Sequence, residues 1–198
     1  MIHSYQASPA MTLAVRRTTA STRRRAAGAS LLALAVGLAM SGQAAAQATV
    51  ITERDPSVLD GTWFAPGGWT NGTPQLTVEN YAYIDSPIPV VVDVPNAVSW
   101  RIDVGHAGSG ELLIHDGGIL ESTAIFIATQ PGSTGKVTVT GAGSKWIGNN
   151  SIGVGHFGNG TLDVLAGGEV DNAQGTWVAS ELGSTGVLTV ADAGSRFA

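Results

Sequence analysis

Gly110-Glu111-Leu112-Leu113-Ile114 is the first of four copies of one short pattern. The other three copies are Gly135-Lys136-Val137-Thr138-Val139, Gly160-Thr161-Leu162-Asp163-Val164 and Gly186-Val187-Leu188-Thr189-Val190. Their leading glycines are separated by 25, 25 and 26 residues. A fixed period of about 20–50 residues is the signature of a stacked repeat architecture. The pattern therefore decides the fold class.

Two kinds of unit alternate along the chain. Residues 102–110 (Ile-Asp-Val-Gly-His-Ala-Gly-Ser-Gly) match residues 152–160 (Ile-Gly-Val-Gly-His-Phe-Gly-Asn-Gly), fifty positions later. The intervening units match one another through residues 132–135 and 183–186, which both read Gly-Ser-Thr-Gly. Each complete repeat is thus a pair of units of about 25 residues.

Each unit contains three short apolar segments. Leu112 and Ile114 have period-two spacing, which places both side chains on one face of a strand. The second segment carries Leu120, Trp146, Val170 or Phe197, and the third begins near Ile102, Ile127, Ile152 or Val178. The glycines between segments are typical of tight turns. We therefore predict an all-β fold: a right-handed parallel β-helix of roughly four 25-residue coils, with neighbouring coils about 4.8 Å apart.

The chain divides into three parts. In residues 1–48, Arg23-Arg24-Arg25 precedes an apolar stretch (26–40) and an alanine-rich run (44–48). This order predicts a secretory signal peptide cleaved after Ala46 or Ala48, and the arginine pairs leave a twin-arginine export route open. The apolar stretch is shorter than the ~20 residues of a membrane-spanning helix. Residues 49–101 are predicted to form a divergent N-terminal cap or first coil, and residues 102–198 the β-helix repeats.

Composition excludes several classes of protein. The 198 residues include no cysteine, so disulfides, thiolate metal sites and cysteine nucleophiles are excluded. Past residue 48 the chain has five basic and fifteen acidic residues, which gives a net charge of −10. Such a body has no basic footprint for nucleic acid. It is also unsuited to electrostatic binding of anionic lipid, and we expect no lasting membrane insertion of this segment.

Three stretches together resemble a known repeat family. They are the V-G-x-x-G-x-G-x-L stretch from Val104 to Leu112, the pair Gly117-Gly118, and residues 135–146 (Gly-Lys-Val-Thr-Val-Thr-Gly-Ala-Gly-Ser-Lys-Trp). About residues 98–198 resemble the passenger repeats of bacterial autotransporters, the type V secretion proteins, in the form shared with PEP-CTERM proteins. The resemblance implies a β-helical passenger carried to the cell surface through an outer-membrane β-barrel of the same polypeptide.

The sequence departs from that plan at its end. It stops at Ala198 within a half-unit, without a barrel-like run of amphipathic strands or a PEP-CTERM tail. We therefore expect an N-terminal fragment, a truncated gene product or an incomplete reading frame, with the barrel translocator missing. A full-length protein with a barrel would be at the cell surface, and otherwise the product would be periplasmic or secreted.

No candidate catalytic, cofactor or metal site emerges. His106 and His156 hold the same position in successive long repeats, about 10 Å apart by strand spacing and too far apart to share one metal. His115 has no repeated partner. The loop 105–110 superficially suggests a phosphate loop but lacks its following helix. Acids of the kind that bind calcium or cleave glycans are scattered over turns and strands: Asp116, Glu121, Asp163, Glu169 and Asp171.

We interpret Trp146, Trp177 and Phe197 as core or stacking residues rather than a sugar platform. The expected function is therefore not enzymatic. It is that of an exported structural or adhesive stalk that meets a surface receptor, a glycan or neighbouring cells. Two alternatives remain open at this point: a secreted glycan-active β-helix of the lyase or hydrolase type, and a non-functional truncated remnant.

Overall fold

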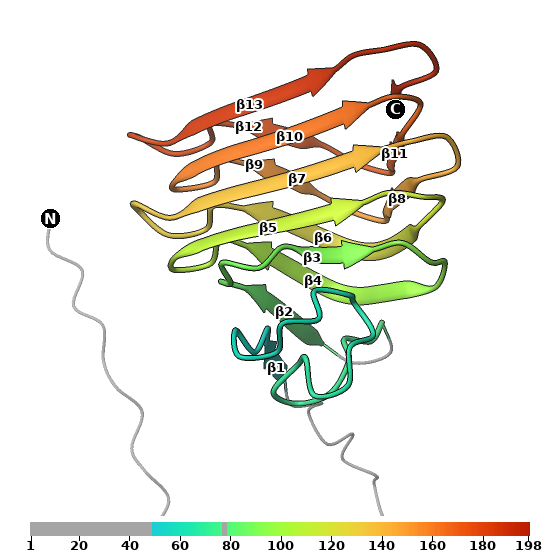
Figure 1. Ribbon diagram of the computed structural model, residues 1–198. Helices are drawn as coiled ribbons and strands as arrows, with labels where there is room; N and C mark the ends of the chain where they lie inside the picture. The colour runs from blue at the N-terminus through green and yellow to red at the C-terminus, as the bar shows by residue number, and fades with distance from the viewer. Residues whose placement is uncertain (1–48, 77–78) are drawn as a thin grey trace, which may run out of the picture. The chain divides into compact units, whose positions relative to one another are not determined.

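The computed structural model describes residues 49–76 and 79–198. The predicted signal peptide, residues 1–48, lies outside the described residues. The described chain is all-β, and its strands stack as successive parallel coils (Figure 1). The predicted parallel β-solenoid of about four coils is confirmed. In this part of the chain no helix is long and apolar enough to cross a membrane.

Two parallel sheets enclose the core. The five-stranded sheet contains β3 (Val90–Val92), β5 (Ser109–Ile114), β7 (Thr134–Thr140), β10 (Asn159–Leu165) and β13 (Thr185–Val190). The nine-stranded sheet contains β1 (Val50–Glu53), β2 (Asn80–Ile84), β4 (Ala97–Val104), β6 (Ile119–Ile127), β8 (Lys145–Gly148), β9 (Ile152–Val154), β11 (Glu169–Asn172), β12 (Thr176–Val178) and β14 (Arg196–Phe197). Each coil supplies one strand to the first sheet and two strand segments to the second, and in β4 and β6 these two segments run on as one strand.

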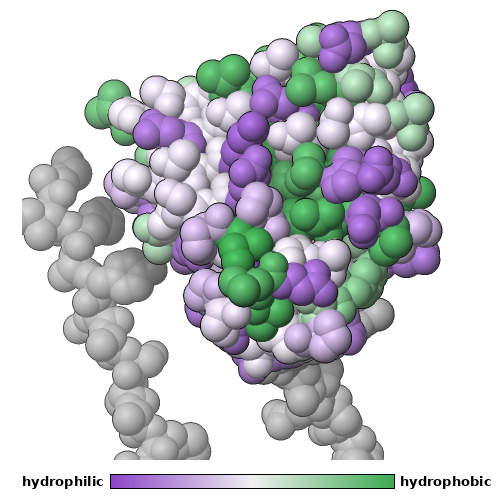
Figure 2. Space-filling model, viewed as in Figure 1, coloured by the Kyte–Doolittle hydropathy of each residue, from purple (hydrophilic) through white to green (hydrophobic). Residues whose placement is uncertain are grey.

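The signature pattern forms the five-stranded sheet in register. Gly110 pairs with Gly135, which pairs with Gly160, which pairs with Gly186. Leu112 and Ile114 are fully buried, as are their partners in the next two coils. Most of the side chains that alternate with them on the outer face are polar, Leu113 and Val187 being apolar, and Lys136 lies 3.8 Å from Glu111. Figure 2, seen from this side, shows hydrophilic and hydrophobic residues intermixed.

The strand register confirms the equivalences predicted for the second segment of each coil but not all of those predicted for the third. The predicted equivalence of Leu120, Trp146, Val170 and Phe197 is confirmed by the strand register. The third set is wrong at two positions, because Ile102 pairs with Ile125 and Ile152 pairs with Thr176. Ile127 and Val178 instead align with Val104 and Val154, in a second ladder of inward side chains two residues further along the strands. Apolar residues two positions apart fit either ladder, so periodicity alone did not separate them.

Turn length explains the alternation of the two units. Between the third segment and the five-stranded sheet, one type has four residues (105–108 and 155–158) and the other has six (128–133 and 179–184). In the longer turn Ser133 donates to the carbonyl of Gln130 (2.8 Å) and accepts from its amide (3.2 Å). Ser184 makes the same two bonds with Glu181. The repeated Gly-Ser-Thr-Gly is therefore a turn that its serine closes.

The leading glycines are required by close backbone approach. A Cβ atom on Gly110, Gly135 or Gly186 would overlap the carbonyl oxygen that ends the third segment of the preceding coil. At Gly135 that oxygen belongs to Val104, which also accepts a ladder hydrogen bond from Ala128 (2.9 Å). The glycine thus lies against a bond that joins two coils. The paired glycines of the turns have the other predicted role, since Gly117 has φ +81°.

Residues 49–101 contain a coil of the same stack and a cover for its end. β2 and β3 pair with β4 and β5, so they continue both sheets. Ahead of them, a loop brings Trp63 and Trp69 over the end of the core, where they are 1% and 4% exposed. Their ring centroids are 5.0 Å apart, and Trp69 donates to the carbonyl of Trp63 (2.8 Å). Two large aromatic side chains therefore close this end of the core.

We predict that Gly135→Ala destabilises the fold by about 2 kcal/mol or more, because the new methyl group must displace ladder backbone. Gly175→Ala is the matched control, since a Cβ atom there meets nothing within 4 Å. Denaturant unfolding followed by circular dichroism gives both free energies. Equal unfolding midpoints for the two variants would refute the steric role of the leading glycine.

Candidate functional site

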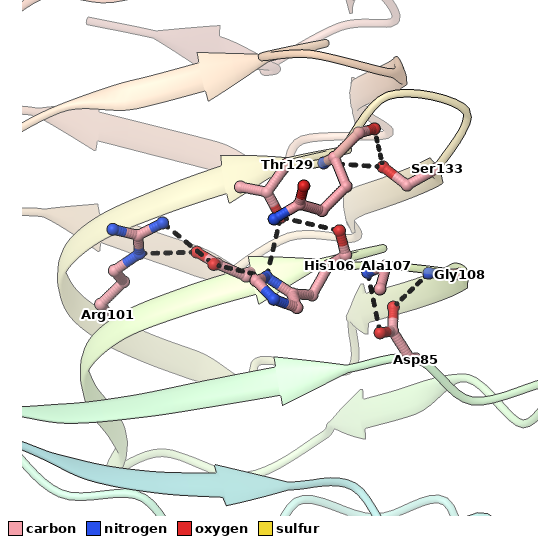
Figure 3. Close-up of polar contacts among 9 residues, drawn as sticks. Asp85, Arg101, His106, Ala107, Gly108, Thr129 and Ser133 are labelled. Atoms are coloured by element: carbon pink, nitrogen blue, oxygen red, sulfur yellow. Dashed lines mark hydrogen bonds and ion pairs between the residues drawn. The ribbon is translucent and has the colours of Figure 1, made fainter.

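A partly buried ion pair lies on the outer side of the nine-stranded sheet. Arg101 and Asp103 are two residues apart in β4, so they share a face. Arg101 donates from Nε (2.7 Å) and Nη2 (3.0 Å) to the two carboxylate oxygens of Asp103. His106 Nδ1 lies 3.2 Å from the same carboxylate (Figure 3). The Asp103 side chain is fully buried, so these partners replace its water.

Aromatic rings cover this cluster. The Tyr83 ring stacks on His106 with centroids 3.9 Å apart and planes 5° apart. The Arg101 guanidinium lies 5.1 Å from the Tyr81 centroid and 4.5 Å from that of Phe126. Burial, and next the charge of Asp103, raise the pKa of Tyr83. Burial opposes the charge of Arg101, but its hydrogen bonds and charge interaction with Asp103 outweigh burial and raise its pKa.

The turn that carries His106 binds an internal anion. The amides of Ala107 and Gly108 donate to the Asp85 carboxylate, at 2.9 and 3.2 Å. Successive backbone amides of this kind form an anion-binding concavity. Because Asp85 already fills it, the resemblance of residues 105–110 to a phosphate loop has a structural explanation (Figure 3).

The geometry around His106 holds a ring in place. Thr129 Oγ1 lies 3.3 Å from Nδ1, the same nitrogen that faces Asp103. In a Ser-His-Asp triad the acid and the nucleophile contact opposite nitrogens of the ring. Here both contacts fall on Nδ1, and Thr129 also donates to the carbonyl of His106 (3.3 Å). The arrangement therefore orients His106 and does not activate the Thr129 hydroxyl.

His156 occupies the equivalent position two coils later, as the sequence predicts, with different neighbours. Strand register puts Gly153 in the place of Asp103 and Phe126 in the place of Tyr83. The His156 ring lies 5.0 Å from Phe126 and 4.5 Å from Phe157. Its Nδ1 is buried and has no hydrogen-bond partner within the described residues. The second histidine thus keeps the aromatic contact and loses the carboxylate.

The acids weighed in the sequence do not converge on one site. Asp163 lies on β10, in the five-stranded sheet. His115 Nδ1 contacts Asp116 at 2.8 Å, and Glu121 accepts from Asn149 at 2.8 Å. Among the residues that the structure describes, no group of three His, Cys, Asp or Glu side chains could hold a metal ion.

Glu169 and Asp171 do come together, between two cations. Lys145 lies 3.5 Å from Glu169 and 2.5 Å from Asp171, and Arg196 contacts both carboxylates. The hydrogen bond from Lys145 holds the pKa of Asp171 below its ordinary value of 3.8. The same bond raises the pKa of Lys145. These acids therefore form a surface ion-pair network that ties adjacent coils.

The tryptophans divide between core and surface. Trp146 is fully buried and donates to Ser122 Oγ (2.9 Å), and Phe197 packs on the core, as interpreted from the sequence. For Trp177 a core position is wrong, because its side chain is 49% exposed. Thr176 and Val178 continue the inward ladders of Ile152 and Val154, so Trp177 between them points outward. The alternation around Val178, which the sequence analysis did assign to the third segment, already places Trp177 on the outward face, but the sequence interpretation did not use it.

No family model matches this sequence, and no curated protein or solved structure matches it. The fold and the chemistry of the described residues are therefore the basis for inferring function. In these residues the outer side of the nine-stranded sheet carries the densest cluster of aromatic and charged contacts: Tyr81, Tyr83, Arg101, Asp103, His106 and Phe126.

Asp103→Ala should lower the free energy of unfolding by about 2–4 kcal/mol, since it leaves Arg101 without its buried partner. Asp163→Ala, which removes an outward carboxylate of β10, should cost less than about 0.5 kcal/mol. Denaturant titration measures both. An Asp103→Ala protein as stable as the wild type would show that the pair does not stabilise the fold.

The Asp171 network predicts a pH dependence. Because the folded-state pKa of Asp171 is lowered, its contribution to stability is present above its ordinary pKa and is lost as pH falls through the folded value. Asp171→Asn should therefore lower the melting temperature at neutral pH, and the difference from the wild type should vanish in acid. In a Lys145→Met background the substitution should have a smaller effect at neutral pH. A difference that persists unchanged in acid contradicts this account.

Proposed function

We propose that this chain is a passenger segment of an autotransporter-like protein, a structural and adhesive stalk exported to the cell surface. The observation that carries the proposal is the continuous in-register stack of coils, whose interior is filled by aliphatic side chains. Each coil adds about 4.8 Å of length. The mechanism is geometric: the stack extends a long outer surface that is available to partners.

The side-chain chemistry supports a non-enzymatic role. The two acids that come together, Glu169 and Asp171, are engaged by Lys145 and Arg196. Asp103 is engaged by Arg101 and His106. A general acid or base needs access to substrate and a proton to exchange. Carboxylates bound to fixed cations serve the stability of the stack instead.

Export is the first step to test. We expect the full chain, expressed in a Gram-negative host with a C-terminal tag, to leave the cytoplasm and to begin at Gln47 or Thr49 by N-terminal sequencing. Leu32→Arg, which places a charge in the apolar stretch, is the matched control and should keep the leader uncut in the cytoplasm. An uncut wild-type protein in the cytoplasm would overturn the proposal.

Display is the second step. When the chain is joined ahead of an outer-membrane β-barrel translocator, the stack should become accessible to protease added outside intact cells. The fusion carrying Leu32→Arg should stay protected. Protection of the wild-type fusion at normal expression would contradict the passenger role, even if the leader is cleaved.

A further inference from the structure

Among the outward rows of the nine-stranded sheet, one changes its chemistry at every coil. The register aligns Glu53 with Tyr83, Tyr83 with Asp103, Asp103 with Phe126, Phe126 with Gly153, and Gly153 with Trp177. The corresponding inward ladders are almost wholly aliphatic. This row, which we call the aromatic row, places an aromatic ring in every second coil, at Tyr83, Phe126 and Trp177.

A cavity adjoins each end of the aromatic row. The first, of about 340 Å³, is lined by Glu53, Tyr83, Asp85 and His106 together with the start of the loop after β1. The second, of about 320 Å³, is lined by His156, Trp177, Ser180 and Glu181. Each combines an aromatic ring with a histidine and a carboxylate. Between three and four strand spacings separate them along the stack, roughly 15–20 Å.

We propose that the aromatic row binds an extended, uncharged oligosaccharide that runs along the stack from Tyr83 to Trp177. A sugar ring has an apolar face that packs on an aromatic ring and a rim of hydroxyl groups that need hydrogen-bond partners. The 49%-exposed Trp177 side chain supplies such a ring face. Glu181 supplies acceptors beside it, and His156 and Ser180 line the same cavity.

Charge selects among possible occupants. The side chains with free acidic groups at the two cavities are Glu53 and Glu181, and Asp85 adds a third negative charge. Arg54, the cation at the first cavity, donates to the carbonyls of Asp60 and Thr62 within its own loop. A uronic acid polymer would therefore be repelled. An apolar peptide would have to desolvate these carboxylates without neutralising them.

The inference rests on the proposed function, because it names the partner class of the adhesive stalk. The export and display assays use cells, whereas binding is measured on the purified mature chain. If the titration fails, oligosaccharide binding by the aromatic row is refuted and the proposal of an exported stalk is unaffected. If the export assay fails, the stalk is refuted, and the titration still measures binding by the aromatic row.

Isothermal titration with cellohexaose and N-acetylchitohexaose, both extended and uncharged, tests the proposal. Hexagalacturonate is the charged comparison, and maltohexaose is the curled one. We expect the wild type to bind at least one extended probe and to bind neither comparison measurably. Trp177→Ala should weaken binding roughly tenfold. Phe64→Ala is the matched control, since Phe64 is 46% exposed in the loop over the other end of the core, and it should change affinity by less than about twofold.

Three results would overturn the proposal. They are no binding of either extended probe by the wild type, binding of hexagalacturonate as tight as that of the extended probes, and equal affinity in wild type and Trp177→Ala. Circular dichroism of each variant checks that its fold is intact. Quenching of the exposed tryptophan by acrylamide should also fall on addition of the bound probe in the wild type and in Phe64→Ala.

Discussion

At the leading glycine of each coil, the backbone passes so close to a neighbouring peptide group that no side chain fits. At Gly110, Gly135 and Gly186 that neighbour is a carbonyl oxygen of the preceding coil, which already accepts a ladder hydrogen bond. The contact fixes where the five-stranded sheet begins relative to the nine-stranded sheet. The register of each following strand is set from this point, so the alignment of the core side chains depends on the close contact at the leading glycine.

A fixed interior leaves the outer rows free to vary. Inward positions must present an apolar side chain of suitable size in every coil, because each one packs on the rung above and below. Outward positions meet only solvent and their ladder neighbours. Along one outward row this freedom yields tyrosine, aspartate, phenylalanine, glycine and tryptophan in succession. In a solenoid of this kind such rows can change their surface chemistry without disturbing the core.

The two histidines illustrate how one scaffold position takes two chemical forms. His106 is fixed by Asp103 and by the flat contact with Tyr83. His156 faces Phe126, and Gly153 leaves space for that ring, since a Cβ atom there would lie 2.8 Å from it. The first environment satisfies the imidazole internally. The second leaves its buried Nδ1 without a hydrogen-bond partner within the described residues.

The sequence by itself determined the repeat, the parallel solenoid and the alignment of two of the three segments in each coil. The period is a local property: residues ten or eleven positions after a leading glycine occupy equal places, as Leu120, Trp146, Val170 and Phe197 do. Only the tertiary structure decided the register of the third segment, the pairing of Arg101 with the buried Asp103 and the exposure of Trp177. These depend on corner geometry and on contacts between coils. Residues 23 or 27 positions apart become neighbours there, because the turns between segments differ in length.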